Sequence, residues 1–332
     1  MATKKRIVLI GGGTGPSNLL QGLRNYPVDL TMIVSTADSG GSSGVLRHEL
    51  GIPPVGDIKQ CVLALGDFSH EERDLWNYRF TKGKLQGHSI GNLILAGLAE
   101  ATGSLETALE RAKNIWNVAG DVLPMTSKAT TLCVRYKDGT VVCDEHEIDE
   151  PKTLHGDIVH AYLKKKEAIA GKASKAIEKA DLIILGPGDL YTGTVPALLT
   201  HGVHEALQSS RAPILYISNL MTSRGETDGF TLSRLIEMIN HYVYPRKVDS
   251  VLVNSSKIPS AILKRYKMYG EVPMVADLSN PIFTNMKVAR KPLLDTAQAV
   301  VQVKADPLRR SLIRHDSKNV ARAVIEILRS NY

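Results

Sequence analysis

The sequence has few cysteines, few aromatic residues and no long hydrophobic run. Its 332 residues include three cysteines, Cys61, Cys133 and Cys143, whose spacing forms neither a disulfide framework nor a metal motif. No apolar run approaches the ~20 residues that a transmembrane helix needs, so we expect no membrane span. The apolar run after the basic N-terminus is too short for a secretory signal. We therefore expect a cytoplasmic protein.

Aromatic residues make up 5% of the chain, which is few for a protein that stacks on nucleic-acid bases. No RNA-binding or DNA-binding motif is present. The net charge of +7 suits an anionic partner, but an ordinary basic surface is the simpler explanation. We therefore expect no nucleic-acid partner.

Asp138-Gly139 predicts a two-residue hairpin turn between two β-branched stretches. With that turn, Val134 pairs with Cys143, and the thiols of Cys133 and Cys143 point to opposite faces of the ribbon. We therefore expect no disulfide between them, which agrees with a reducing cytoplasm. The apolar face of this hairpin is expected to carry Leu132, Val134, Tyr136, Val141 and Cys143.

Short β-branched segments alternate with helical segments, which is typical of a parallel sheet with helices on both faces. The expected strands are 7–10, 30–34, 182–185, 214–217, 248–253 and 300–303. The expected helices are 16–24, 57–65, 92–100, 105–116, 196–207, 231–242, 260–269 and 318–328. We predict one α/β domain over residues 1–332, a Rossmann-like three-layer fold with a mostly parallel sheet and an antiparallel hairpin insertion at about 128–150.

The strand predicted at 7–10 runs directly into a loop formed by Gly12, Gly13, Thr14 and Gly15. A glycine loop that opens a helix can hold phosphate on its backbone amides. A dinucleotide fingerprint has a further glycine where Pro16 stands, so binding of NAD is disfavoured. A P-loop is excluded because no Gly-Lys-Ser/Thr follows, and a tubulin-like loop has a glycine where Ser17 stands. A glycine-rich turn without a ligand is the remaining alternative.

Three more loops of small and polar residues follow predicted strands. The second loop follows 30–34 and contains Asp38, Ser42, Ser43 and Gly44. The third follows 182–185 and contains Gly188, Asp189 and Thr192. The fourth follows 214–217 and contains Asn219, Thr227 and Asp228. Because ligands bind at the carboxyl ends of parallel strands, we expect the four loops to meet and hold a diphosphate.

The sequence offers few candidates for catalysis. Asp38 could bind a ribose hydroxyl or a metal ion, and Asp57 either caps its helix or lies near that metal. Asn92 begins a predicted helix and could reach a phosphate or a sugar, whereas His88 is better explained as a structural histidine than as a general base. No Ser/His/Asp order, HExxH motif or EF-hand loop is present. Asp38 and Asp57 are therefore the only catalytic candidates, and no metal site is firmly predicted.

Five segments together resemble the gluconeogenesis factor (YvcK) family, which is related to CofD, the 2-phospho-L-lactate transferase of deazaflavin coenzyme synthesis. They are GGGTGPSNLLQGL, ADSGGSSGVLRHELGIPPVGDIKQC, GHSIGNL, LGPGDLYTGTVPALL and NLMTSRGETDGF. The resemblance covers nearly the whole chain and implies a Rossmann-like fold with a nucleotide site. The YvcK branch implies a UDP-sugar-binding regulatory protein that supports cell shape and wall synthesis during gluconeogenic growth. The CofD branch implies transfer of a phospholactyl group from a nucleoside diphosphate with a divalent metal.

Three positions depart from the family pattern. Ser39 stands at the second acidic position of the second loop, Asp189 stands where serine is common, and Ser223-Arg224 replaces a common Gln-Pro pair. A metal on a pyrophosphate prefers several anionic oxygens, so the loss of one carboxylate favours the binding protein over the transferase. We expect a UDP-sugar ligand, Mg²⁺ only under the transferase alternative, and a homodimer as a possible assembly.

Overall fold

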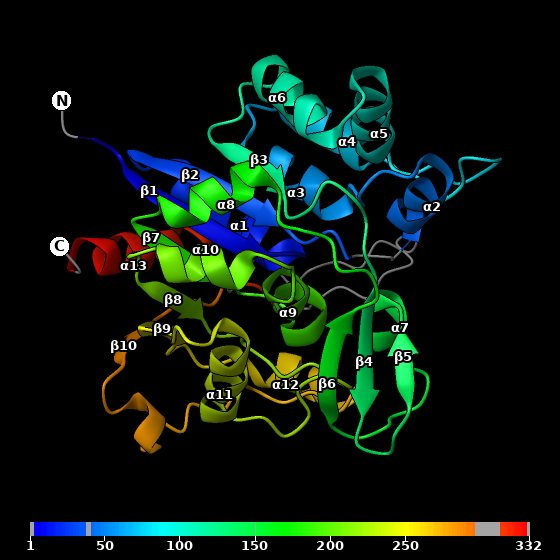
Figure 1. Cartoon of the computed structure of the whole chain (residues 1–332). Helices are drawn as coiled ribbons and strands as arrows, with labels where there is room; N and C mark the ends of the chain where they lie inside the picture. The colour runs from blue at the N-terminus through cyan, green and yellow to red at the C-terminus, as the bar shows by residue number, and fades with distance from the viewer. Residues whose placement is uncertain (1–2, 38–40, 150, 296–312, 331–332) are drawn as a thin grey trace.

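The computed structural model describes residues 3–37, 41–149, 151–295 and 313–330. Its main sheet has seven strands in the order β10-β9-β8-β7-β1-β2-β3, and every neighbouring pair is parallel (Figure 1). The strands are β1 (Lys5–Gly11), β2 (Val28–Val34), β3 (Asp121–Pro124), β7 (Leu182–Leu185), β8 (Ile214–Ile217), β9 (Ser250–Asn254) and β10 (Lys287–Lys291). The predicted parallel sheet is confirmed. The strand expected at 300–303 lies outside the described residues.

The two edge strands of this sheet, β3 and β10, were not predicted. The β3 strand is short and ends in Pro124, while β10 carries three basic side chains in five residues. Proline and charge are typical of edge strands, which do not bury both faces and so lack the long apolar runs of the central strands. Their sequences therefore carry little strand signal.

The main sheet is covered by helices on both faces. One face packs against α1 (Thr14–Leu23), α3 (Gly56–Leu65), α5 (Ile90–Thr102), α6 (Leu105–Ile115) and α13 (Ser317–Ser330). The other face packs against α8 (Gly171–Glu178), α9 (Val195–Leu198), α10 (Val203–Ser209) and α11 (Leu232–Val243). The remaining helices are α2 (Gly41–Leu50), α4 (His70–Asn77), α7 (Glu145–Asp149) and α12 (Ser260–Lys267).

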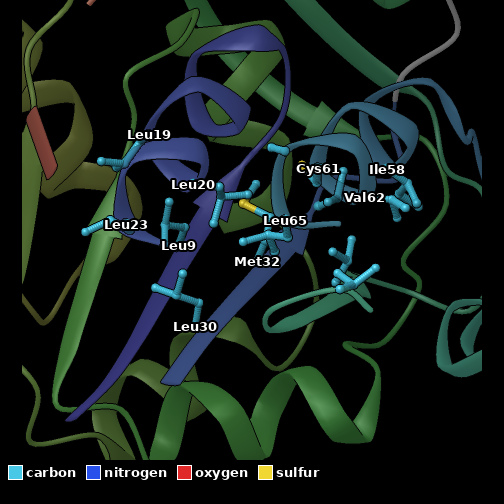
Figure 2. Packing of buried hydrophobic residues seen from close by; sticks show 14 of the residues in the cluster. Leu9, Leu19, Leu20, Leu23, Leu30, Met32, Ile58, Cys61, Val62 and Leu65 are labelled. Carbon is cyan, nitrogen blue, oxygen red and sulfur yellow. The ribbon is translucent and has the colours of Figure 1, made fainter. Parts of the chain in front are cut away.

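The buried parts of the central strands are largely apolar because both of their faces are covered. In β1, Ile7 and Leu9 belong to the core beneath α1 and α3, whereas Val8 and Ile10 belong to the core on the opposite face. Figure 2 shows Leu9, Leu30 and Met32 on the first of these faces, opposite leucines of α1 and side chains of α3. The alternation along each strand thus divides the hydrophobic core into two layers.

The helix expected at 196–207 is wrong as a single element. The structure has a π-helical segment, η1 (Leu190–Thr194), followed by α9 and α10 with a break at 199–202. Gly202 caps α10 in a left-handed conformation with φ of 91°, which other residues rarely adopt. The break turns the chain so that α10 packs beside α8.

A second, three-stranded antiparallel sheet interrupts the βα order, with β5 (Val141–Cys143), β4 (Leu132–Tyr136) and β6 (Ile158–Leu163) in that order. The expected hairpin is therefore present, but a third strand, β6, extends the antiparallel element beyond 150. Leu132, Val134 and Tyr136 pack into the core shared with the large sheet. In Figure 1 this sheet stands at the lower right, away from α4, α5 and α6 at the top.

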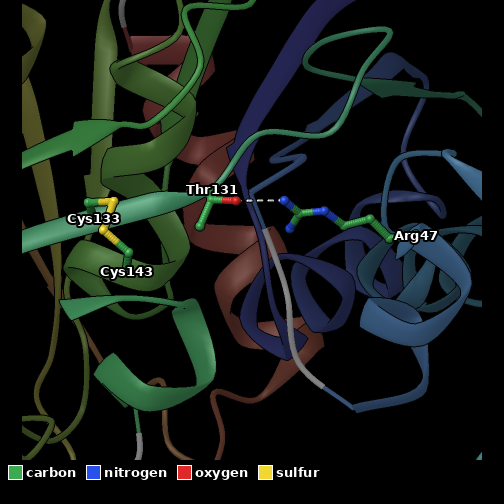
Figure 3. Close-up of a disulfide and its surroundings, with 4 residues drawn as sticks. All are labelled: Arg47, Thr131, Cys133 and Cys143. Atoms are coloured by element: carbon green, nitrogen blue, oxygen red, sulfur yellow. Dashed lines mark hydrogen bonds between the residues drawn. A yellow bond between two sulfur atoms is a disulfide. The ribbon is translucent and has the colours of Figure 1, made fainter. Parts of the chain in front are cut away.

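The register predicted for this hairpin is wrong, and so is the absence of a disulfide. Cys133 pairs with Cys143, and the two residues form a disulfide (Figure 3). The turn is one residue longer than predicted because Gly139, with φ of 91°, forms a bulge after a tight turn that begins at Tyr136. This shift of one residue moves the β5 side chains to opposite faces, so Val142, rather than Val141, packs toward the core.

The described residues contain no helix that is both long and apolar enough to cross a bilayer.

Candidate functional site

The connections of the large sheet reverse direction between β1 and β7. The chain leaves β1 for β2 and β3 on one side and later adds β7, β8, β9 and β10 on the other. In open parallel sheets, ligands bind beside the carboxyl ends of the two strands that flank this reversal. The first and third predicted loops follow these two strands.

These two loops are in direct contact. A β-carbon added to Gly188 would lie 3.4 Å from the Gly12 carbonyl oxygen. A β-carbon added to Gly15 would overlap the Pro187 carbonyl group, so only glycine allows the loops to approach this closely. The glycine loop after β1 is therefore shaped by its contact with the loop after β7 as well as by the helix that it opens.

The fourth loop is bonded to the third by two side chains. The Asn219 amide donates a hydrogen bond of 2.9 Å to the Gly188 carbonyl oxygen and accepts one of 3.2 Å from the Tyr216 hydroxyl. The Glu226 carboxylate accepts hydrogen bonds from the Tyr191 and Thr192 backbone N–H groups, at 2.8 and 3.1 Å. It also accepts one of 2.6 Å from the Thr192 hydroxyl.

Glu226 is a buried carboxyl group at the centre of this contact, only 3% exposed. Burial raises its pKa well above the ordinary value, and the nearby charges of Asp189 and Asp149 raise it further. The hydrogen bonds from Thr192 and Tyr191 oppose that rise. The protonation state of Glu226 therefore depends on the hydrogen bonds that join the two loops.

Asp57 does not cap its helix. The N-cap of α3 is Val55, and the Asp57 carboxylate instead accepts a hydrogen bond of 2.5 Å from the Gly13 backbone N–H. A β-carbon on Gly12 would come within 2.7 Å of the same carboxylate oxygen. One amide of the predicted phosphate loop is thus bonded to a carboxylate from a separate helix.

The second loop begins beside the first. The Ser35 backbone N–H, just after β2, donates a hydrogen bond of 3.0 Å to the Gly11 carbonyl oxygen. Further along, the Asn92 amide of α5 donates one of 3.2 Å to the Ser43 hydroxyl, and both side chains are buried. This bond joins α5 to the first turn of α2. The prediction of a loop is therefore wrong for Ser42, Ser43 and Gly44, which lie in that helix. Asp38 lies outside the described residues, as do the side-chain surroundings of Ser42.

The remaining predicted contacts have local partners. Thr227 accepts a hydrogen bond of 2.8 Å from the Ser223 backbone N–H, and Asp228 accepts one of 2.6 Å from the Gly225 backbone N–H. The Thr14 carbonyl oxygen accepts one of 2.8 Å from the Ser17 hydroxyl in the first turn of α1. These bonds shape the loops, and the roles of these residues in ligand contact stay predictions.

Sequence reasoning missed two buried ionisable groups at this edge of the sheet. Glu226 lies within a quoted motif, where an acid among small residues was its only signal. The sequence around His315 gave no signal, because the residues that it contacts are remote in sequence. The His315 carbonyl oxygen accepts a hydrogen bond from the Asn18 amide, and its ring is bonded to the Ser218 backbone. Burial lowers the pKa of His315 to about 4, although the Ser218 bond opposes that shift.

His88 is buried at 6% exposure, and its Nδ1 atom has no hydrogen-bond partner within the described part of the chain. No group of three or more His, Cys, Asp or Glu side chains among the described residues could hold a metal ion.

Comparison with known proteins agrees with this fold. A family model described as 2-phospho-L-lactate transferase CofD matches residues 7–294. The gluconeogenesis factor of Bacillus subtilis (strain 168) is 38% identical over 99% of this chain and 100% of that protein. The gluconeogenesis factor of Halalkalibacterium halodurans is 40% identical over 82% of this chain and 85% of that protein. A crystal structure of a UPF0052 family protein from Bacillus halodurans has a TM-score of 0.89 and 34% identity, and the match covers 98% of this chain and 100% of that one.

The strand order and the loops at the reversal point define a Rossmann-like α/β protein with its candidate site at the carboxyl edge of the sheet. Within that class, the chain belongs to the gluconeogenesis factor family, and its residues 7–294 match the CofD family model. The family resemblance and the fold class predicted from the sequence are both confirmed.

Proposed function

We propose that this chain is a cytoplasmic UDP-sugar-binding regulatory protein that supports cell shape and wall synthesis during growth on gluconeogenic carbon sources. The observation that carries the proposal is the direct contact of the loops after β1 and β7, to which the loop after β8 is bonded. Glycine amides and short polar side chains gathered at one strand reversal suit an anionic, hydroxyl-rich ligand. The name gluconeogenesis factor, carried by relatives that align over most of this chain, supports the physiological setting.

In this proposal the diphosphate lies on the amides of residues 12–15 and 42–44, with Gly188, Asp189 and Thr192 on its other side. Asp38, Asn92, Asn219, Thr227 and Asp228 contact sugar or ribose hydroxyls. Asp57 already holds the Gly13 amide, so a bound diphosphate meets a carboxylate. The repulsion between the Asp57 carboxylate and the diphosphate is relieved if Asp57 moves away or if a cation lies between the carboxylate and the phosphates.

Thermal denaturation with UDP-N-acetylglucosamine tests this binding. A ligand that binds only the folded state adds about 2.7 kcal/mol to the free energy of unfolding at about 100 times its Kd. We expect the melting temperature to rise by several degrees with the nucleotide sugar. Free N-acetylglucosamine, the matched control without a diphosphate, should leave it unchanged. A folded sample that shows no shift at millimolar nucleotide sugar contradicts the proposal.

The Asp57–Gly13 contact favours one alternative, a CofD-like transferase that acts on a nucleoside-diphosphate-linked substrate. Mg²⁺ usually binds through one or two carboxylates together with substrate phosphates, so Asp57 fits as one ligand only when a diphosphate is present. The cation would supply neutralisation of the diphosphate charge. This alternative predicts Mg²⁺-dependent turnover of a nucleotide-activated donor that is lost in Asp57→Asn. A donor panel with no turnover favours the binding protein.

The assembly of the chain is a separate proposal. A homodimer suits a fold of this kind, and light scattering during size-exclusion chromatography would distinguish it from a monomer.

A further inference from the structure

The C-terminal end of α12 carries exposed cations and exposed apolar side chains together. We call these residues the α12 patch: Lys264, Arg265, Lys267, Met268, Tyr269 and Val272. Met268 is 81% exposed, more than any other large hydrophobic side chain among the described residues. It lies four residues after Lys264, so the two side chains share the outer face of the helix.

The opposite face of α12 fixes this patch to the body of the protein. Ile262, Leu263 and Tyr266 belong to a hydrophobic cluster that also contains the buried Met221. The Tyr266 hydroxyl accepts a hydrogen bond of 3.2 Å from the Ile313 backbone N–H. Because packing holds the inner face of α12, the side chains on its outer face stay exposed.

Hydrogen bonds also hold the chain that follows α12. The Glu271 backbone N–H donates one of 3.2 Å to the Tyr266 carbonyl oxygen, which closes the turn after the helix. The Val272 backbone N–H then donates one of 3.0 Å to the Thr222 hydroxyl, and the Val272 carbonyl oxygen accepts one of 2.8 Å from the Thr222 backbone N–H. The exposed side chain of Val272 is therefore kept near the end of α12.

The charge of this region is predominantly positive. Residues 257–275 contain four cations and one carboxylate, Glu271. The three cations of the α12 patch form no ion pair with any other described residue. The next carboxylate along the chain, Asp277, accepts hydrogen bonds from the Ser233 backbone N–H and hydroxyl. The α12 patch therefore presents positive charge to an anionic partner.

The exposed apolar side chains of the patch distinguish among the classes of anionic partner. Binding to the phosphates of a nucleic acid needs cations but no exposed methionine or valine. Interfaces between proteins are depleted of lysine, whereas two of the three cations here are lysines. An anionic lipid surface suits both components, because basic side chains bind its headgroups and apolar side chains enter the boundary between headgroups and acyl chains.

We propose that the α12 patch binds the surface of a membrane that contains anionic lipids. Its cations contact the headgroups, while Met268, Tyr269 and Val272 enter the interface. Three cations and three apolar side chains give a weak and reversible attachment. Since α12 follows β9, it begins at the edge of the sheet that carries the candidate site, and this attachment brings that site to the membrane. The inference does not depend on nucleotide binding.

The test is flotation of the full chain with lipid vesicles, without nucleotide, at ~0.1 M salt, where charges more than about 10 Å apart are screened. Vesicles that contain phosphatidylglycerol are compared with vesicles of phosphatidylcholine alone. Lys264→Glu together with Lys267→Glu reverses the charge of the patch. The matched control is Lys175→Glu together with Lys179→Glu, because both lysines are exposed at the end of α8. This helix contacts β3, at the edge of the sheet far from β9 (Figure 1).

A second pair of variants tests the apolar part of the patch. Met268→Asp places a charge where we expect contact with lipid. Ile115→Asp is its control, because Ile115 is also an exposed apolar side chain but lies at the end of α6. Melting curves establish that each variant is folded, and size-exclusion chromatography without vesicles gives its oligomeric state.

We expect the parent chain to float with the phosphatidylglycerol vesicles and not with phosphatidylcholine alone. The Lys264→Glu, Lys267→Glu double variant should weaken this binding by at least about tenfold, and Met268→Asp by about tenfold. Both controls should stay within about twofold of the parent chain. If the double variant is unfolded, Lys264→Ala together with Lys267→Ala should still weaken binding by about fivefold or more.

Four results would overturn the proposal. A folded parent chain that binds neither kind of vesicle would do so, and so would equal weakening by the two double variants, which would assign the binding to overall charge. Binding that Met268→Asp leaves unchanged would mean that the cations attract an anionic partner without contact with lipid. A parent dimer that Met268→Asp converts into a monomer would make the patch an interface between two copies of the chain. The proposed nucleotide function survives each of these results.

Discussion

The buried ring of His315 predicts a specific loss of stability in mild acid. Burial lowers its pKa from 6.5 to about 4, so the folded protein keeps the ring neutral at pH values where the unfolded chain protonates it. The unfolded state then binds more protons, and the free energy of unfolding falls as the pH drops from about 6.5 to about 4. At about 1.4 kcal/mol for each pKa unit, the full loss is about 3 kcal/mol.

His315→Asn removes this titration and keeps an amide that can bond to the Ser218 backbone. Urea denaturation at intervals between pH 7 and pH 4 gives the free energy of unfolding of the parent chain and of the variant. We expect the difference in the free energy of unfolding between the parent chain and His315→Asn to change by about 3 kcal/mol between pH 7 and pH 4. The parent chain loses stability over this range because only it carries a histidine that must stay neutral in the folded state. Groups that are present in both proteins, such as Asp181 and Asp277, contribute equally to the two pH profiles. Their pKa values are lowered, so their contributions to stability are lost at more acidic pH.

His146→Asn is the matched control, because His146 is exposed on α7. It should follow the pH dependence of the parent chain. If His315→Asn also follows it, the ring does not resist protonation in the folded state, and the argument from burial fails.

Three further predictions concern contacts that hold the loops and the small sheet. Under denaturing conditions without reductant, a thiol reagent should titrate one cysteine in each chain, because Cys133 and Cys143 are bonded and Cys61 is free; three thiols would contradict the disulfide. Gly15→Ala should lower the free energy of unfolding, measured by urea titration, by about 1–3 kcal/mol, because the added methyl group overlaps Pro187. Gly97→Ala is the control: Gly97 lies in a helix with open space around it, so this change should be neutral or stabilising. Glu226→Ala should lower the free energy of unfolding by about 1–3 kcal/mol, because two buried N–H groups lose their acceptor. Glu226→Gln keeps a carbonyl oxygen and should lower it less. Equal losses in the two variants would show that the acceptor is unimportant. The raised pKa of Glu226 also means that the parent chain loses stability as the pH rises from about 4.5 through the folded pKa, and Glu226→Gln should abolish that part of the pH profile.

The sequence by itself determined the central strands of the large sheet and the edge at which the loops after them gather. A run such as Ile7–Ile10 is apolar at every position, which only a strand buried on both faces requires, and the amphipathic helices between such runs make the sheet parallel. Once the strands are parallel, the loops that follow them must gather at one edge. The contact between the loops containing Gly15 and Pro187 follows from this rule.

Tertiary structure alone decided which side chains enter that edge. Asp57 bonds to Gly13 from 44 residues away, Glu226 bonds to Tyr191 from 35, and His315 bonds to Asn18 from 297, so no local pattern could reveal these pairs. The register of Cys133 and Cys143 depended on one bulged glycine whose conformation is compatible with either turn length. Local periodicity reports only whether a face is buried. The partner of each polar group depends on how distant elements pack, because a buried donor or acceptor needs a hydrogen bond and its partner can come from any part of the folded chain.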